Sequence, residues 1–178
     1  MSRTNNFVFS SLKIVSWVIF VGLCIEAGAL IINFIVNLYK PEFVHNLYQK
    51  LDLSEMYDDS KWAFFRIYSF ILIIAILKAI LFYVEVMLVT KMDLKQPFNS
   101  FVSKQISLIC YYTFSIGILS YIGRESAKQL ENQNFYLEQI SQFWEDSQAF
   151  ILMSAIIYII AQIFKRGIEI QSENELTI

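Results

Sequence analysis

Two side chains of opposite charge stand inside an otherwise apolar stretch at residues 76–89, which reads ILKAILFYVEVMLV. Lys78 and Glu85 are seven residues apart, close to two helical turns, so a helix places both on one face. A third charge, Glu26, interrupts another apolar stretch. An unpaired charge inside a bilayer costs at least about 2.5 kcal/mol. These residues therefore indicate either a structural ion pair or a site for a proton, an ion or a ligand.

Antiparallel neighbouring helices would bring Glu26 and Lys78 to a similar depth, and a pair between them would fix the register of the helices. Glu85 is expected nearer one surface, where Lys104 or a tyrosine hydroxyl could reach it. The sequence leaves the structural and the functional interpretation open. The full candidate cluster of buried polar and charged residues is Glu26, Asn33, Lys78, Glu85, Tyr112 and Tyr158.

The elements that would hold these side chains are four long apolar runs. Of the 178 residues, 56% are hydrophobic and only 17% are charged, with a mean hydropathy of +0.49; soluble domains have about 25% charged residues. The predicted spans cover approximately residues 12–37, 64–90, 102–123 and 145–166. Each is long enough to cross a bilayer, and only helices satisfy the backbone of such segments in lipid. We predict an all-α polytopic membrane protein, with residues 1–178 forming a single four-helix transmembrane bundle.

Each run also carries a stripe of small or polar residues, which membrane helices use to pack against one another. We expect these stripes to face the interior of the bundle. They are Gly22, Glu26, Ala29, Asn33 and Asn37 in the first run, Lys78 and Glu85 in the second, Gln105, Tyr112 and Ser115 in the third, and Ser147, Ser154, Tyr158 and Ala161 in the fourth.

The two outer connections have helical periodicity of their own. Residues 41–51 and 126–142 are each predicted to form a short amphipathic helix over the membrane surface or the bundle. Trp62 and Trp144 stand where the chain re-enters the membrane, as interface anchors do.

Lysine and arginine near the helix ends favour a cytoplasmic N-terminus and C-terminus. The segments thus placed inside hold Arg3, Lys13, Lys91, Lys95, Lys104, Lys165 and Arg166, and those outside hold Lys40, Lys50, Lys61, Arg124 and Lys128. The net charge of −2 gives no indication of nucleic-acid binding.

The inner turn DLKQPFNS and the tail IFKRGIEIQSENELTI form a second region of interest. Asn99 or Ser100 is the expected N-cap of the third helix. The last helix can continue past Gly167, and the apolar tail residues either fold back near Phe98 and Phe101 or dock a cytoplasmic partner. The candidate docking or closure residues are Pro97, Phe98, Gly167, Glu173, Asn174, Glu175, Leu176 and Ile178.

These two motifs, with the length and the four-span layout, resemble the bacterial membrane family known as domain of unknown function 2975. Glu175 stands where members of that family commonly have Asp. The resemblance covers essentially the whole chain and implies a four-helix protein of the bacterial inner membrane. Because such proteins are often encoded beside a small helix-turn-helix regulator, it also implies a regulatory partnership, and it implies no activity.

Residues suited to catalysis or metal binding are sparse. His45 is the only histidine, Cys24 and Cys110 both lie within spans, and no phosphate-binding loop or catalytic triad pattern occurs. We expect no enzyme, no cofactor and no metal site. The leading hypothesis is a small interaction or regulatory membrane protein, whose partners are the lipid bilayer and a cytoplasmic regulator or another membrane protein. The alternative is a transport- or immunity-type protein that uses Glu26, Lys78 and Glu85. A homo-oligomer is left open.

Overall fold

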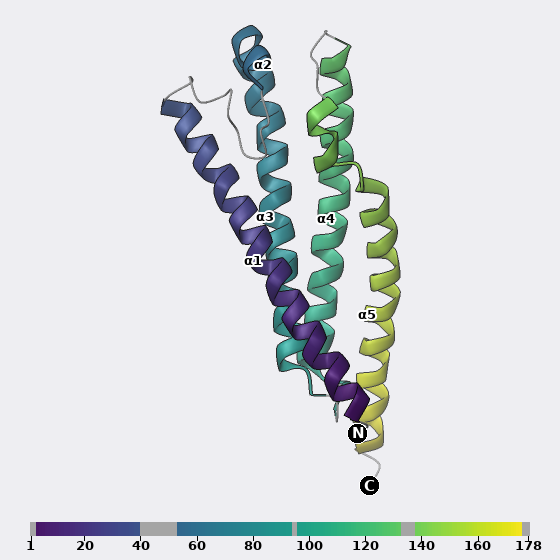
Figure 1. The fold of residues 1–178 in the computed structure, drawn as a ribbon. Helices are drawn as coiled ribbons and strands as arrows, with labels where there is room; N and C mark the ends of the chain where they lie inside the picture. Colours follow the sequence, from purple (N-terminus) through teal and green to yellow (C-terminus); the bar gives the residue numbers. More distant parts are fainter. Residues whose placement is uncertain (1–2, 40–52, 94–95, 133–137, 176–178) are drawn as a thin grey trace.

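The computed structural model describes residues 3–39, 53–93, 96–132 and 138–175, and within them the long elements are all helices (Figure 1). These helices are α1 (Arg3–Tyr39), α3 (Lys61–Lys91), α4 (Ser100–Glu131) and α5 (Ser147–Glu175). Two short elements, α2 (Ser54–Asp59) and the 3-10 helix η3 (Glu138–Phe143), lie in the connections. Four helices are long and apolar enough to cross a membrane. The predicted fold class is confirmed. The first three helices extend beyond their predicted spans at both ends, and α5 begins two residues later than predicted and ends nine residues later.

Side-chain caps fix where two of the long helices begin. Before α3, the Ser60 hydroxyl accepts a hydrogen bond from the Ala63 N–H at 3.3 Å. Before α4, the Asn99 side-chain oxygen accepts one from the Val102 N–H at 2.9 Å. Of the two residues proposed for this role, Asn99 is therefore the N-cap. Such a bond satisfies one of the backbone donors that the first turn of a helix leaves without a partner.

Each long helix packs mainly against the next one in the chain, in the order α1, α3, α4, α5. In Figure 1, α1 slants across α3, and its N-terminal end lies at the same end of the bundle as the C-terminal end of α5. Within the described residues, α1 and α5 make no extensive contact with each other. The bundle is therefore open on the side between its first and last helices.

Three apolar clusters hold the helices together. The largest joins α1, α2, α3, α4 and η3 around the fully buried Phe64 and Tyr68. Ile74, Leu81 and Ile116 form a second cluster between α3 and α4. The third lies at the opposite end from α2. It consists of Val102, Ile106 and Ala161, with Leu88, Met92, Phe101, Ile157 and Phe164 packed against them.

Gly117 lies where α4 and α5 pack closely, and a larger side chain at this position would not fit. A Cβ atom on Gly117 would lie 2.7 Å from Ile151 Cγ1 and 3.0 Å from the Ile151 backbone nitrogen. Nearby, the Cys110 thiol donates a hydrogen bond to the Ser154 carbonyl oxygen at 3.4 Å. Small side chains thus let two backbones approach, as is common between membrane helices.

The predicted inward stripes are only partly correct. In α1, Asn37 is buried and Gly22 is exposed, while the other buried residues are Ser16, Ala27 and Leu30. In α4, the buried face is Cys110, Thr113, Gly117 and Ser120, and the predicted Gln105, Tyr112 and Ser115 are half-buried. In α5, Ser147, Ser154 and Ala161 are buried as predicted, but Tyr158 is 55% exposed. A tyrosine ring is too large for the close α4–α5 contact, so it lies on the outer face.

The connections also differ from expectation. In the described part of residues 126–142, α4 continues to Glu131 and the 3-10 helix η3 covers Glu138–Phe143, in place of a separate amphipathic helix. Trp144 is only 3% exposed and belongs to the largest apolar cluster, so it is a core residue rather than an interface anchor. Trp62 is 76% exposed, as an anchor requires. The helix predicted at residues 41–51 lies outside the described residues.

Candidate functional site

Glu85 connects α3 to α1 through a hydrogen bond that the sequence did not indicate. The buried Ser16 hydroxyl donates to Glu85 Oε1 at 3.3 Å. The prediction that Lys104 or a tyrosine hydroxyl reaches Glu85 is wrong, because its partner comes from the first helix. The only available signal was that Ser16 is a hydroxyl residue within an apolar stretch.

Lys78 approaches a different helix. Its Nζ atom lies 5.8 Å from the centre of the Phe150 ring on α5. At this distance an ammonium group is attracted by the negative face of the ring. Lys78 and Glu85 lie on one face of α3. At Glu85 this face contacts Ser16 of α1, and at Lys78 it contacts Phe150 of α5. It therefore borders the open side of the bundle.

Glu26 and Lys78 lie at similar depth, as predicted. The rings of Phe20 and Tyr83 contact each other, with centroids 5.8 Å apart. Glu26 is six residues beyond Phe20, and Lys78 is five residues before Tyr83 on an antiparallel helix. These separations correspond to about 9 and about 7.5 Å along the two axes, so the two charges lie at nearly the same level.

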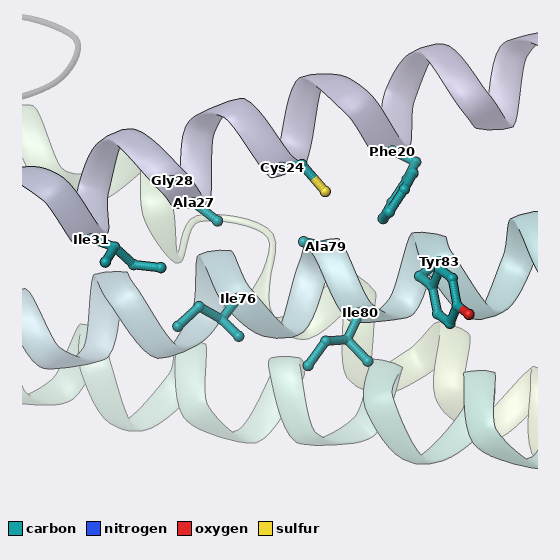
Figure 2. Close-up of a pocket in the computed structure, with 9 residues that line it drawn as sticks. All are labelled: Phe20, Cys24, Ala27, Gly28, Ile31, Ile76, Ala79, Ile80 and Tyr83. Carbon is teal, nitrogen blue, oxygen red and sulfur yellow. The ribbon is translucent and has the colours of Figure 1, made fainter.

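The predicted ion pair between Glu26 and Lys78 is nevertheless not formed. The ion pairs between described residues join Arg124 and Lys128 to Glu125, and Arg166 to Glu169. Two reasons follow from the helix geometry. Lys78 extends toward α5, and Glu26 is about 200° around α1 from Cys24, which faces α3 (Figure 2). Both charged residues are half-buried.

The other members of the predicted cluster are dispersed. Asn33 is half-buried on α1, Tyr112 packs against the second apolar cluster, and Tyr158 lies on the outside of α5. The charged residues therefore border the open side of the bundle without forming one closed polar cluster.

A groove runs between α1 and α3, and none of these charged residues lines it (Figure 2). It has a volume of about 410 Å³. Phe20, Cys24 and Ile31 line it from α1, and Ala79 and Tyr83 line it from α3. Figure 2 shows the Phe20 and Tyr83 rings at one end, with Cys24 facing Ala79 in the middle. The groove is apolar almost throughout.

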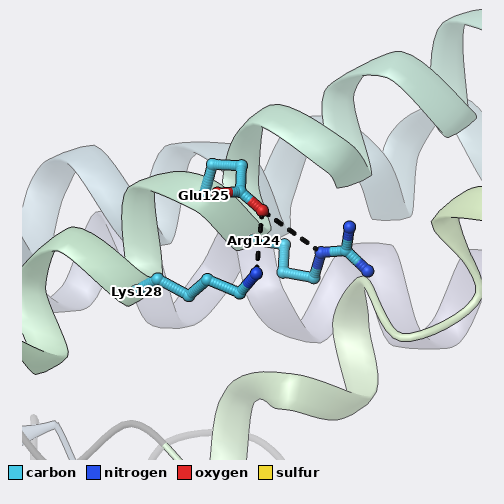
Figure 3. A network of polar contacts seen from close by, with 3 residues as sticks. All are labelled: Arg124, Glu125 and Lys128. Carbon is cyan, nitrogen blue, oxygen red and sulfur yellow. Dashed lines mark hydrogen bonds and ion pairs between the residues drawn. The ribbon is translucent and has the colours of Figure 1, made fainter.

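One network of charged side chains lies on α4 at the end of the bundle near α2. At the end near α2, Glu125 Oε1 lies 3.0 Å from Lys128 Nζ and 3.7 Å from Arg124 Nε (Figure 3). The Arg124 guanidinium also lies 5.4 Å from the centre of the Tyr121 ring. Exposed ion pairs of this kind contribute at most about 1 kcal/mol to stability. We therefore regard this network as a surface feature of α4 and not as part of the candidate site.

The second predicted region brings the inner turn onto α5. Phe98 packs against Phe164, with ring centroids 5.2 Å apart. A Cβ atom on Gly167 would lie 2.6 Å from Phe98 Cδ1. The glycine thus provides the space for the ring, and Pro97 beside it is half-buried.

Beyond this contact α5 continues as a helix to Glu175 and does not turn back toward Phe98. Glu173 is exposed, and the backbones of Asn174 and Glu175 are helical. Leu176 and Ile178 lie outside the described residues, so the packing of the last apolar side chains stays a prediction.

The chain has no match among protein-family models, curated proteins or solved structures. The family resemblance of the two motifs therefore stays a prediction.

The unpaired arrangement of Glu26 and Lys78 predicts that their effects on stability are independent. Replacing each by a neutral side chain, Glu26→Gln and Lys78→Met, removes a charge from a membrane segment, so each variant should melt at the same or a higher temperature than the wild type. In the double variant, the two changes in unfolding free energy should add to within about 0.5 kcal/mol. Thermal unfolding of the purified protein in detergent measures this, with the exposed Lys104→Met as a control. A coupling of about 1 kcal/mol or more would show that the two residues pair in the membrane.

Proposed function

We propose that the protein is a small interaction or regulatory protein of the bacterial inner membrane, with both termini in the cytoplasm. The observation that supports this proposal most directly is the extension of α5 past the contact between Phe98 and Gly167. In that extension, Ile170 is 47% exposed. An exposed isoleucine on a helix outside the membrane is suited to contact with another protein.

The position of Ile170 along α5 strengthens this proposal. Ile156, Ile163 and Ile170 are all exposed and are spaced seven residues apart. A heptad spacing keeps side chains on one face of a helix and is the pattern by which helices pack against partner helices. This stripe begins in the apolar part of α5 and passes beyond Lys165 and Arg166. A partner helix that continues from the membrane into the cytoplasm would match it.

The proposed topology predicts the outcome of reporter fusions. Fusions within the inner turn at Lys95 and after Ile178 should report the cytoplasm, because the basic residues near these ends stay on that side. Fusions at Asp58 and at Asn132 should report the outside. An external signal at Lys95 or a cytoplasmic signal at Asp58 would contradict the four-span arrangement.

The docking role of the α5 extension predicts a site-specific contact in cells. A photo-crosslinking residue placed at Ile170 should give a discrete protein adduct, because its side chain lies on the exposed stripe. The same residue at Ser172 provides the matched control. Ser172 is also exposed but lies about 200° around the helix from Ile170. Equal adducts at both positions, or none at Ile170, would contradict docking by this face.

Deletion of residues 172–178 separates docking from fold-back of the tail. If the tail docks a partner, the purified truncated protein should unfold within about 2 °C of the full chain, since the adjoining residues of α5 are exposed. The Ile170 adduct should weaken in the same variant. A large loss of stability would indicate instead that the tail packs back on the bundle.

Transport or immunity is the second proposed function, and one observation favours it. Glu26 and Lys78 keep half-buried charges at one depth of the spanning helices without neutralising each other. Charges retained in a membrane despite their cost commonly serve a pathway or a ligand. Under this proposal, the Glu26→Gln and Lys78→Met variants fold normally and yet abolish a cellular phenotype that deletion of the gene also abolishes. Under the regulatory proposal, both variants retain it.

A further inference from the structure

The groove between α1 and α3 exists because its walls carry small residues. Cys24, Ala27 and Gly28 on α1 face Ala79 on α3 along its middle. A Cβ atom placed on Gly28 would meet nothing within 4 Å. The two helices are in contact at the Phe20 and Tyr83 rings, and the space between those rings and Ile31 is left unfilled by the chain itself.

The length of the groove matches the thickness of one bilayer leaflet. From Phe20 to Ile31 the chain advances eleven residues, or about 16 Å along the α1 axis. The hydrocarbon core of a bilayer is about 30 Å thick, so one leaflet contributes about 15 Å. Trp17 packs edge-on against Phe20, with centroids 5.8 Å apart. The Phe20 and Tyr83 rings close the end of the groove that is nearer to Lys13.

Lys13 lies on the same face of α1 as the groove, beyond the end formed by Phe20. Lys13 precedes Phe20 by seven residues and Ile31 by eighteen, so all three lie on one face of α1. Lys13 is exposed, and it lies about 10 Å beyond Phe20 along the axis. This is the level at which a lipid headgroup would lie above an acyl chain in the groove.

We propose that the groove binds one acyl chain of an anionic phospholipid whose phosphate lies at Lys13. The apolar lining suits the chain, and the lysine complements the negative charge of the headgroup.

Native mass spectrometry of the full-length protein tests this proposal. The protein is prepared in detergent with equal amounts of dioleoylphosphatidylglycerol and dioleoylphosphatidylcholine, which have the same chains and differ in headgroup charge. We expect the first bound lipid to be predominantly phosphatidylglycerol. Lys13→Gln should reduce that preference about fivefold, the value of one lysine near an anionic headgroup.

Filling the groove should remove the lipid. Gly28→Leu places four carbon atoms in the space of the acyl chain and should weaken the first binding event about tenfold or more. Gly22→Leu is the matched control, because a Cβ on Gly22 also meets nothing within 4 Å but Gly22 does not line the groove. Ala79→Leu fills the groove from the opposite wall and should have the same effect as Gly28→Leu.

Circular dichroism establishes that each of these variants is folded. Two results would overturn the proposal: unchanged lipid binding in both groove-filling variants, or an equal loss in Gly22→Leu. Equal binding of the two lipids by the wild type would overturn the assignment of the headgroup to Lys13.

Discussion

Replacing Tyr68 by alanine is expected to destabilise the protein more than any other single substitution proposed for it. Tyr68 is 0% exposed, and its ring is stacked between Phe34 and Phe64, with both centroids 5.5 Å away. Removal of a buried aromatic side chain leaves a cavity and typically costs about 3–5 kcal/mol. In a protein of this size, we expect a decrease in Tm of about 6–20 °C, measured by thermal unfolding in detergent.

Tyr68→Phe separates the ring from the hydroxyl. The hydroxyl donates a buried hydrogen bond to the Leu30 carbonyl oxygen at 3.1 Å, which joins α3 to α1. Because phenylalanine keeps the stacked ring, the cost should fall to about 1 kcal/mol, the net value of one hydrogen bond. If Tyr68→Phe were as unstable as Tyr68→Ala, the hydrogen bond rather than the aromatic packing would hold α1 in place.

The features of the fold that depend on local sequence were predictable. Apolar runs of sufficient length located the long helices, and the polar residues after a proline-containing turn located the start of α4 at Asn99 or Ser100. In α5, Ser147, Ser154 and Ala161 are spaced by seven residues and do face inward. In each case the signal lies within one element and needs no knowledge of its neighbours.

The features that depend on the order of the helices were not predictable. A polar stripe gives the inner face of a helix only when that helix is surrounded, and α1 is packed mainly against α3. Its buried residues therefore include Ser16 and Leu30, while Gly22 is exposed. The partner of Lys78 was missed for the same reason, because Phe150 belongs to a helix that is distant in the sequence.

The candidate site was predictable to a similar extent. The depth of Glu26 and Lys78 follows from counting residues along two antiparallel helices. Whether they pair depends on the rotation of each helix about its axis, and the sequence constrains that rotation weakly when one face contacts lipid. The contact of Phe98 with Gly167 joins the two motifs that the sequence analysis placed in one candidate region. The groove gave no sequence signal, since small residues such as Cys24 and Ala79 also occur at close helix contacts.

The α4–α5 contact provides the second large expected effect. Gly117→Leu should force these helices apart, because even its Cβ would lie 3.0 Å from a backbone nitrogen of α5, which cannot move without the helix. Overpacking of this kind costs about 1–3 kcal/mol, and with the backbone contact we expect about 2–3 kcal/mol, or about 4–12 °C in Tm. The control is Gly22→Leu, which makes the same chemical change on an exposed face of α1.

The control also removes the effect of helix propensity from the comparison. Leucine is a better helix former than glycine by about 0.7 kcal/mol, so Gly22→Leu should leave the Tm unchanged or raise it slightly. Gly117→Ala should give an intermediate result, since it adds the clashing Cβ alone and gains about 1 kcal/mol in helix propensity. The expected order of Tm is therefore Gly22→Leu, then Gly117→Ala, then Gly117→Leu. If Gly117→Leu were as stable as Gly22→Leu, then α4 and α5 would not be in close contact in the folded protein, and the outer face assigned to α5 would have to be revised with it.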